Sequence, residues 1–200
     1  MFALCRFFSQ TYHVRFISIL NKTTKVETET EVIITYVGLG SNLGDRAGNL
    51  LLAVRGLMEA SFTVCKLSAI YETAPFGVDA AENHAKYLNM VAEIHVKSVS
   101  PSQMLARMLR IEYLLGRRDK NLNKPRTVDL DLLLFGDIKY ATEFLTVPHP
   151  RMHERRFVLV PLAELAPYAV HPILHQEIKQ ILSEVRDDSA VKRWNPAGNG

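Results

Sequence analysis

Residues 124–135 of this 200-residue chain read KPRTVDLDLLLF. The aliphatic and β-branched side chains at positions 128–135 predict a β-strand. Because side chains alternate between the two faces of a strand, Asp129 and Asp131 point the same way, roughly 7 Å apart along the strand. The opposite face is expected to point into a core, and it carries Val128, Leu130, Leu132 and Leu134.

Two carboxylates on one face of an apolar strand repel each other and are costly to bury, so a positive charge should compensate them. Lys124 and Arg126 are one source of that charge, and a hard divalent cation is the other. Mg²⁺ is usually held by one or two carboxylates together with substrate phosphates. A solvated strand face would also explain the Asp-x-Asp pattern. The apolar strand and the position of Arg126, three residues before Asp129, favour the metal–phosphate interpretation.

The composition indicates one globular domain with a sizeable core. A net charge of +3 is too small to argue for a nucleic-acid partner. Cys5 and Cys65 lie far apart and form no Cys-x-x-Cys motif, which indicates a reducing compartment. No apolar run reaches the length of a transmembrane helix, so no membrane partner is expected. We expect a cytoplasmic monomer.

The first residues differ from the rest. Residues 1–26 contain Arg6, Arg15, Lys22 and Lys25, several Ser and Thr, and no acidic residue. This composition resembles a mitochondrial presequence, which would make the protein mitochondrial. A disordered extension, or residues upstream of the true start, would explain it equally well. We therefore divide the chain into an extension at 1–31, a domain at 32–186 and a polar tail at 187–200.

Hydrophobic periodicity predicts the elements of the domain. The sequence Gly-Ser-Asn-Leu-Gly-Asp at 40–45 predicts a tight turn from a strand into a helix that Asp45 caps. Ser100 and Gln103 form a capping box at the start of a helix that Gly116 ends. We expect strands at 32–39, 62–71, 87–96 and 128–135, a return strand from 138 to 140, and helices at 45–60, 101–115, 157–165 and 175–185. The polar loop at 72–86 is either a lid or a disordered connection.

Two further groups of residues suggest ligands. Tyr87 and Asn89 share one face of their strand, where a ring beside an amide suits a flat, hydrogen-bonding heterocycle. Ordinary decoration of a sheet surface explains the same pair. A basic connection leads from the 101–115 helix into the Asp129–Asp131 strand, as a Mg²⁺–polyphosphate complex would require. His149 and Arg155 fit phosphate contacts better than a zinc site.

These motifs occur together in one order: GSNLG at 40–44, YLN at 87–89, GR at 116–117, PRTVDLD at 125–131, and PH at 148–149 followed by Arg155 and Phe157. The set resembles the 6-hydroxymethyl-7,8-dihydropterin pyrophosphokinase family of folate biosynthesis, over about residues 33–185. The resemblance implies a ferredoxin-like α+β fold, with a mainly antiparallel sheet and helices packed on it in α/β/α layers. It also implies transfer of diphosphate from ATP to the pterin hydroxymethyl group, with release of AMP.

The resemblance also implies roles for individual residues. Asp129 and Asp131 would hold two Mg²⁺ ions, and Arg117 and Arg126 would stabilise charge on the transferred group. The ATP-binding residues would be Glu112, Arg117, Arg118, Arg126, Leu132, Thr146, His149 and Arg155. The pterin-binding residues would be Thr73, Ala74, Phe76, Tyr87, Asn89 and Phe157. The family commonly has a Trp before its Pro-Arg pair, where this chain has Asn123 and Lys124.

Two other functions are compatible with parts of the sequence. A non-catalytic pterin- or nucleotide-binding module would keep the fold, but it has no need of two crowded carboxylates. A different Mg²⁺-dependent nucleotide transferase would explain the carboxylates and arginines, but it would not explain Tyr87 and Asn89.

Overall fold

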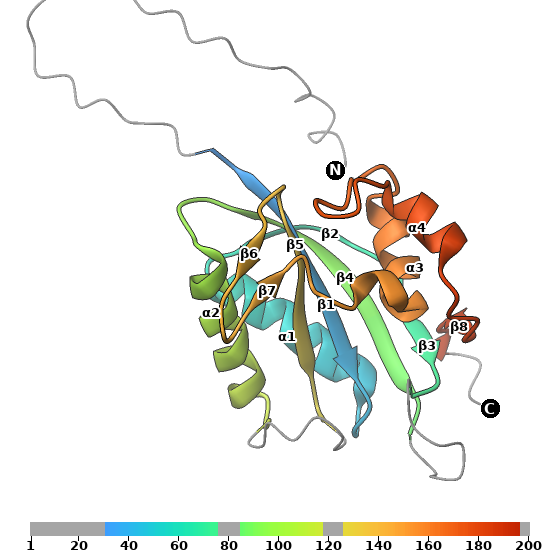
Figure 1. Ribbon diagram of the computed structural model, residues 1–200. Helices are drawn as coiled ribbons and strands as arrows, with labels where there is room; N and C mark the ends of the chain where they lie inside the picture. The colour runs from blue at the N-terminus through green and yellow to red at the C-terminus, as the bar shows by residue number, and fades with distance from the viewer. Residues whose placement is uncertain (1–30, 76–84, 118–125, 197–200) are drawn as a thin grey trace, which may run out of the picture.

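The computed structural model describes residues 31–75, 85–117 and 126–196. In this part of the chain a six-stranded antiparallel sheet lies between two layers of helices (Figure 1). The strand order is β5-β1-β4-β3-β8, and β2 also pairs with β4. The strands are β1 (Ile33–Ser41), β2 (Thr63–Leu67), β3 (Tyr71–Thr73), β4 (Tyr87–Val96), β5 (Asp129–Phe135) and β8 (Val191–Arg193). The predicted ferredoxin-like α+β fold is confirmed.

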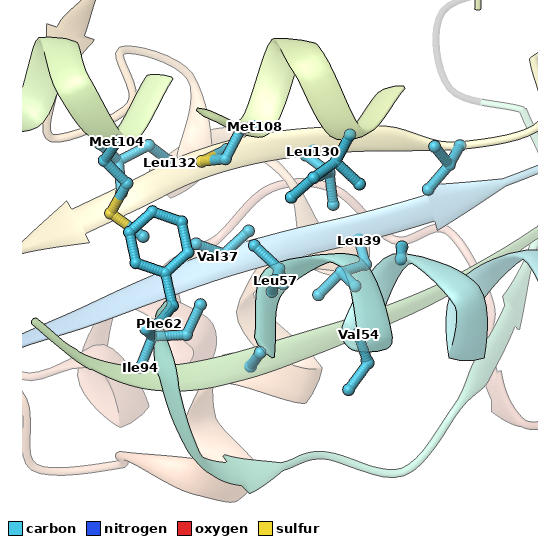
Figure 2. Packing of buried hydrophobic residues seen from close by; sticks show 14 of the residues in the cluster. Val37, Leu39, Val54, Leu57, Phe62, Ile94, Met104, Met108, Leu130 and Leu132 are labelled. Atoms are coloured by element: carbon cyan, nitrogen blue, oxygen red, sulfur yellow. The ribbon is translucent and has the colours of Figure 1, made fainter. Parts of the chain in front are cut away.

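Helices α1 (Arg46–Glu59) and α2 (Pro101–Leu114) cover one face of the sheet. Both predicted caps are present: the Asp45 side chain accepts a hydrogen bond from the Gly48 amide, and Ser100 forms a capping box with Gln103. Side chains of both helices meet those of β1, β4 and β5 in a closed apolar core (Figure 2). This core holds β1, β4 and β5 in position from the α1/α2 face of the sheet.

Helices α3 (Arg156–Leu165) and α4 (Ile178–Glu184) lie on the other face, next to the short 3₁₀ turn η1 (Met152–Glu154). Their core is smaller and includes Tyr36, Val91 and Leu133 from the sheet. It covers the sheet only as far as these residues. Two residues further along the same face of each strand lie Gly38, Asn89 and Asp131, which line a cavity instead.

Strand β5 follows the predicted alternation only in its first half. Leu130 and Leu132 lie in the α1/α2 core, as expected. Tyr36 of β1 pairs with Leu134, but the next residue, Val37, pairs with Leu132, so Leu133 is an extra residue in a bulge. The bulge moves Leu134 into the α3/α4 core, and the predicted side for Leu134 is wrong.

Two predicted strands differ from the structure. The single strand expected at 62–71 is divided into β2 and β3, because at the break the Oγ atom of Ser68 accepts the Val91 amide, 2.9 Å away, in place of a backbone carbonyl. The expected loop consequently starts after Thr73. The return strand expected at 138–140 is instead a hairpin of β6 (Tyr140–Ala141) and β7 (Thr146–Val147).

The C-terminal prediction was incomplete. The sequence predicted only a polar tail at 187–200, but β8 forms there and pairs with β3 at the edge of the sheet. The extension at 1–30 lies outside the described residues.

Candidate active site

A cavity of about 590 Å³ opens on the α3 side of the sheet, beside the ends of β1, β4 and β5. Gly40 of β1 lies between Asn89 on β4 and Asp129 on β5, its partners in the sheet. A Cβ atom at Gly40 would lie 3.1 Å from Asn89 Oδ1, so glycine leaves room for the amide. Most predicted site residues line the cavity: Thr73, Ala74, Tyr87, Asn89, Glu112, Arg117, Arg126, Asp129, Asp131, His149, Arg155 and Phe157.

Asp129 is held between two arginines. Arg117 Nη1 lies 2.7 Å from Asp129 Oδ1, and Arg126 Nη1 lies 2.9 Å from Asp129 Oδ2. Asn42, in the turn after β1, fixes the backbone of Arg126. The side-chain oxygen of Asn42 accepts the backbone amide of Arg126 at 2.8 Å, and the backbone amide of Asn42 donates to the Arg126 carbonyl at 3.3 Å. The Gly-Ser-Asn-Leu-Gly turn thus positions an arginine 84 residues away.

Glu112 anchors the other arginine. This buried carboxylate accepts hydrogen bonds from Arg117 and from the Leu130 amide, the latter at 2.7 Å. Burial raises the pKa of Glu112 to about 7, although the Leu130 amide and Arg117 favour the ionised form. Glu112 therefore ties the C-terminal end of α2 to β5 and orients Arg117 toward Asp129.

Asp131 differs from Asp129 in having no such support. Within the described residues, its carboxylate accepts no hydrogen bond and forms no ion pair. Burial, followed by the charge of Asp129, raises the pKa of Asp131, while Arg155, Arg126 and Arg117 oppose the shift. Free carboxylate oxygens beside a second carboxylate fit a divalent cation such as Mg²⁺, the remaining ligands being water and substrate oxygens.

The end of the cavity near η1 is basic. Arg151 and Arg155 both line it, and neither has an ion-pair partner in the part of the chain that the structure describes. His149 Nδ1 accepts the Arg151 amide at 3.2 Å, so we assign the ring proton to Nε2. Burial, then Arg155 and Arg151, lower the pKa of His149 to about 4, so at neutral pH the ring is an uncharged donor. This end suits a phosphate group.

An adjoining part of the cavity combines an amide with aromatic rings. Asn89 is buried, and its Nδ2 atom donates to Thr73 Oγ1 at 2.8 Å. Tyr87 and Phe157 line the same cavity, and the Arg155 guanidinium lies 5.6 Å from the centre of the Phe157 ring. The predicted heterocycle-binding residues are therefore brought together with the predicted phosphate-binding residues.

The structure does not bring every predicted residue to the cavity. Leu132 is buried in the α1/α2 core, and Thr146 is exposed on β7. Arg118 and Phe76 lie outside the described residues. The sequence did not identify Asn42 or Arg151 as site residues. The only sequence signals were the polar residue in the glycine turn for Asn42 and the basic run at 151–156 for Arg151.

The fold and cavity fit a class of protein that binds a phosphorylated ligand together with a divalent cation, next to a flat polar ring. Comparison with known proteins then gives the family. The family described as 7,8-dihydro-6-hydroxymethylpterin-pyrophosphokinase (HPPK) matches residues 36–167. The chain belongs to the HPPK family.

Individual relatives agree. A 2-amino-4-hydroxy-6-hydroxymethyldihydropteridine pyrophosphokinase of Bacillus subtilis is 45% identical over 162 residues, which cover 80% of this chain and 90% of the relative. The Aquifex aeolicus protein of the same name is 36% identical over 149 residues, covering 74% of this chain and 90% of the relative.

One solved structure shows the same fold in a longer protein. The crystal structure of Plasmodium falciparum HPPK-DHPS superimposes with a TM-score of 0.61 at 16% identity, over 79% of this chain and 46% of that chain. The chain therefore spans less than half of that protein, and at this identity the likeness concerns the fold alone.

Proposed function

We propose that the cavity is the active site of a Mg²⁺-dependent pyrophosphokinase, which transfers diphosphate from ATP to 6-hydroxymethyl-7,8-dihydropterin and releases AMP in folate biosynthesis. One observation carries this proposal: a single cavity in an HPPK-family chain holds the Asp129–Asp131 pair and, beside it, the Asn89 amide. A simple nucleotide-binding site would not need both.

At the phosphate end, Asp129 and Asp131 would hold two Mg²⁺ ions. When bound, the ions would neutralise phosphate charge and orient the polyphosphate. Arg117 and Arg126 are already fixed by Asp129, so their positive charge is in place before the substrates arrive. Arg151, Arg155 and the neutral His149 would bind the remaining phosphate oxygens.

At the pterin end, Asn89 would bind the polar edge of the pterin. Its Nδ2 atom is engaged with Thr73, which fixes the plane of the amide. Tyr87 and Phe157 would cover the faces of the ring. This arrangement would place the pterin hydroxymethyl group toward Asp129.

The reaction requires positioning more than covalent chemistry. The pterin hydroxyl oxygen attacks the β-phosphorus of ATP and loses its proton to solvent, and the bond from that phosphorus to the α-β bridging oxygen breaks as AMP leaves. Asp129, at the boundary between the two ends, would orient the hydroxyl, and the arginines would stabilise charge on the transferred group.

Product analysis tests this function. Purified protein is incubated with ATP, Mg²⁺ and 6-hydroxymethyl-7,8-dihydropterin, and nucleotides are separated by chromatography. The proposal requires AMP that forms only when the pterin is present. ADP would indicate another phosphoryl transfer, and pterin binding without turnover would indicate a non-catalytic module.

Assembly and location are further proposals. We propose that the protein is a monomer, which light scattering coupled to gel filtration tests. In the part of the chain that the structure describes, no helix has the length and apolarity to cross a membrane. The pea relative, 35% identical over 150 residues, is named as mitochondrial. We propose that residues 1–26 act as a presequence, and import of a reporter fused to them would test this against a cytoplasmic location.

A further inference from the structure

Residues 186–196 follow α4 and lie beyond the region that matches the HPPK family. The cavity-lining residues in the described part of the chain come from other segments. Nevertheless, residues 186–196 contact two walls of the cavity, the first turn of α3 and strand β3 (Figure 1). We name residues 186–196 the C-terminal strap.

The strap caps α3 through Asp187. Its Oδ2 atom accepts the amide of Arg156, the first residue of α3, at 2.7 Å, and its Oδ1 atom accepts the Ser189 amide at 3.0 Å. The residue at the N-cap, Arg155, provides no side-chain cap of its own. A carboxylate here satisfies an amide that the helix leaves unpaired and interacts favourably with the helix dipole.

The charge state of Asp187 agrees with this geometry. Burial would raise the pKa of Asp187, but the hydrogen bonds from Ser189 and from the Arg156 amide lower it below its usual value. The carboxylate that caps α3 is therefore ionised at neutral pH.

The capped residue lies between two residues of the cavity. Arg155 precedes Arg156 and Phe157 follows it, and both line the cavity. The backbone of Arg155 is also held by η1, since its amide donates to the Met152 carbonyl at 3.3 Å. The bond from Asp187 thus restrains the peptide between Arg155 and Arg156, one residue before Phe157.

The same strap supports the opposite wall. Its strand β8 pairs Val191 with Thr73, and beyond the strand the Trp194 amide donates to the Ile70 carbonyl at 2.8 Å. The Thr73 hydroxyl accepts the Asn89 amide. The strap therefore supports the strand that holds Asn89 in position.

A second tie joins α3 to β3 at the far end of the helix. Glu164 Oε2 accepts the Ala69 amide at 2.9 Å and the Tyr71 hydroxyl at 3.1 Å. Because this tie lies near the C-terminus of α3, it does not act on the first turn, where Val158 and Leu159 pack into the α3/α4 core. The Asp187 bond restrains that turn, which is the end that borders the cavity.

We propose that Asp187 is a positioning residue for the pterin: through the Arg156 amide it sets the first turn of α3, and hence Phe157, while β8 sets Thr73 on the facing wall. This inference rests on the proposed function, because it names a residue that orders the pterin end of that site.

The test compares Asp187→Asn with Asp188→Asn, since Asp188 is the exposed neighbour of the same type. We expect Asp187→Asn to raise the KM for the pterin about fivefold, because asparagine keeps one acceptor but loses the second acceptor and the negative charge at the start of α3. The KM for ATP and the melting temperature should change little. A pterin KM equal to that of Asp188→Asn would overturn the proposal. An equal rise of both KM values with a lower melting temperature would also overturn it, because it would show a merely structural role.

A second measurement does not depend on turnover. Trp194 is the one tryptophan of the chain, and it packs partly buried against the α1/α2 core. Its fluorescence should shift to longer wavelength in Asp187→Asn, and an unchanged spectrum would overturn the role of the strap. If the wild type forms no AMP, the proposed function fails. Equilibrium pterin binding to the two variants would then still test Asp187, with tighter binding to Asp188→Asn expected and equal binding contradicting it.

Discussion

The two faces of the central sheet differ in what the same strands present. Toward α1 and α2, the sheet carries mainly apolar side chains such as Leu39 and Leu130, besides the buried Thr35 and Ser41, and the layer is closed. Toward α3 and α4, apolar packing stops after Leu133 and Val91, and the strands continue with Gly40 and Asp129 around a cavity. One strand, β5, thus contributes to the core on one face and to the site on the other. Mutations on the two faces should therefore separate stability from activity.

The largest effect on activity is expected for Asp131→Ala. It removes a carboxylate that the proposed ions require, so turnover should fall about a thousandfold, the scale of losing a preorganised electrostatic contact. Stability should not fall, because no protein hydrogen bond is lost and repulsion from Asp129 disappears. Initial rates and thermal melting measure the two effects.

The control for Asp131→Ala is Asp137→Ala, which removes an exposed carboxylate just after β5. It should leave both activity and stability unchanged. Near-normal turnover of Asp131→Ala would refute the metal-binding role.

The opposite pattern is expected for Leu57→Ala on the closed face. Leu57 is fully buried in the α1/α2 core, so the variant should lose about 3 kcal/mol of unfolding free energy, as large-to-small core substitutions do. Turnover per folded molecule should persist, because the cavity lies on the other face. Denaturant unfolding and rates at low temperature measure this.

Leu51→Ala is the matched control, since Leu51 lies on the same helix with 59% of its surface exposed. It should change stability by less than about 0.5 kcal/mol. Equal destabilisation by both substitutions would contradict the described packing of α1.

A smaller effect is expected for Asn89→Ala, which separates the two ends of the cavity. Pterin affinity should fall about tenfold through the lost hydrogen bonds of the amide. Affinity for a non-hydrolysable ATP analogue should stay within about twofold. Calorimetric titration measures both, and Thr73→Val, which removes only the hydroxyl that holds the amide, should show a weaker effect of the same kind. An equal loss for both ligands would refute the assignment of Asn89 to the pterin.

The sequence predicted the parts that depend on local periodicity. Alternation along 128–135 predicted the Asp129–Asp131 pair, and cap residues predicted the starts of α1 and α2. It failed for Leu134, because a bulge is defined by pairing with β1 and not by β5 alone. It missed β8 because a short, polar edge strand is stabilised by its partner, here β3.

The missed site residues have a similar explanation. Asn42 acts on Arg126, which is distant in sequence, so its role appears only when the chain is folded. Arg151 stands in a basic run in which no pattern distinguishes the residue that faces the cavity. Long-range contacts of this kind also define the strap.

The most direct test of the proposed metal site is the number of divalent cations bound per chain. Mn²⁺ would replace Mg²⁺, and electron paramagnetic resonance would count bound ions in the presence of a non-hydrolysable ATP analogue. Two bound ions are expected in the wild type and in Asp137→Ala, and fewer bound ions in Asp129→Ala and Asp131→Ala. The same number of bound ions in all four proteins would contradict the claim that these carboxylates form the metal site.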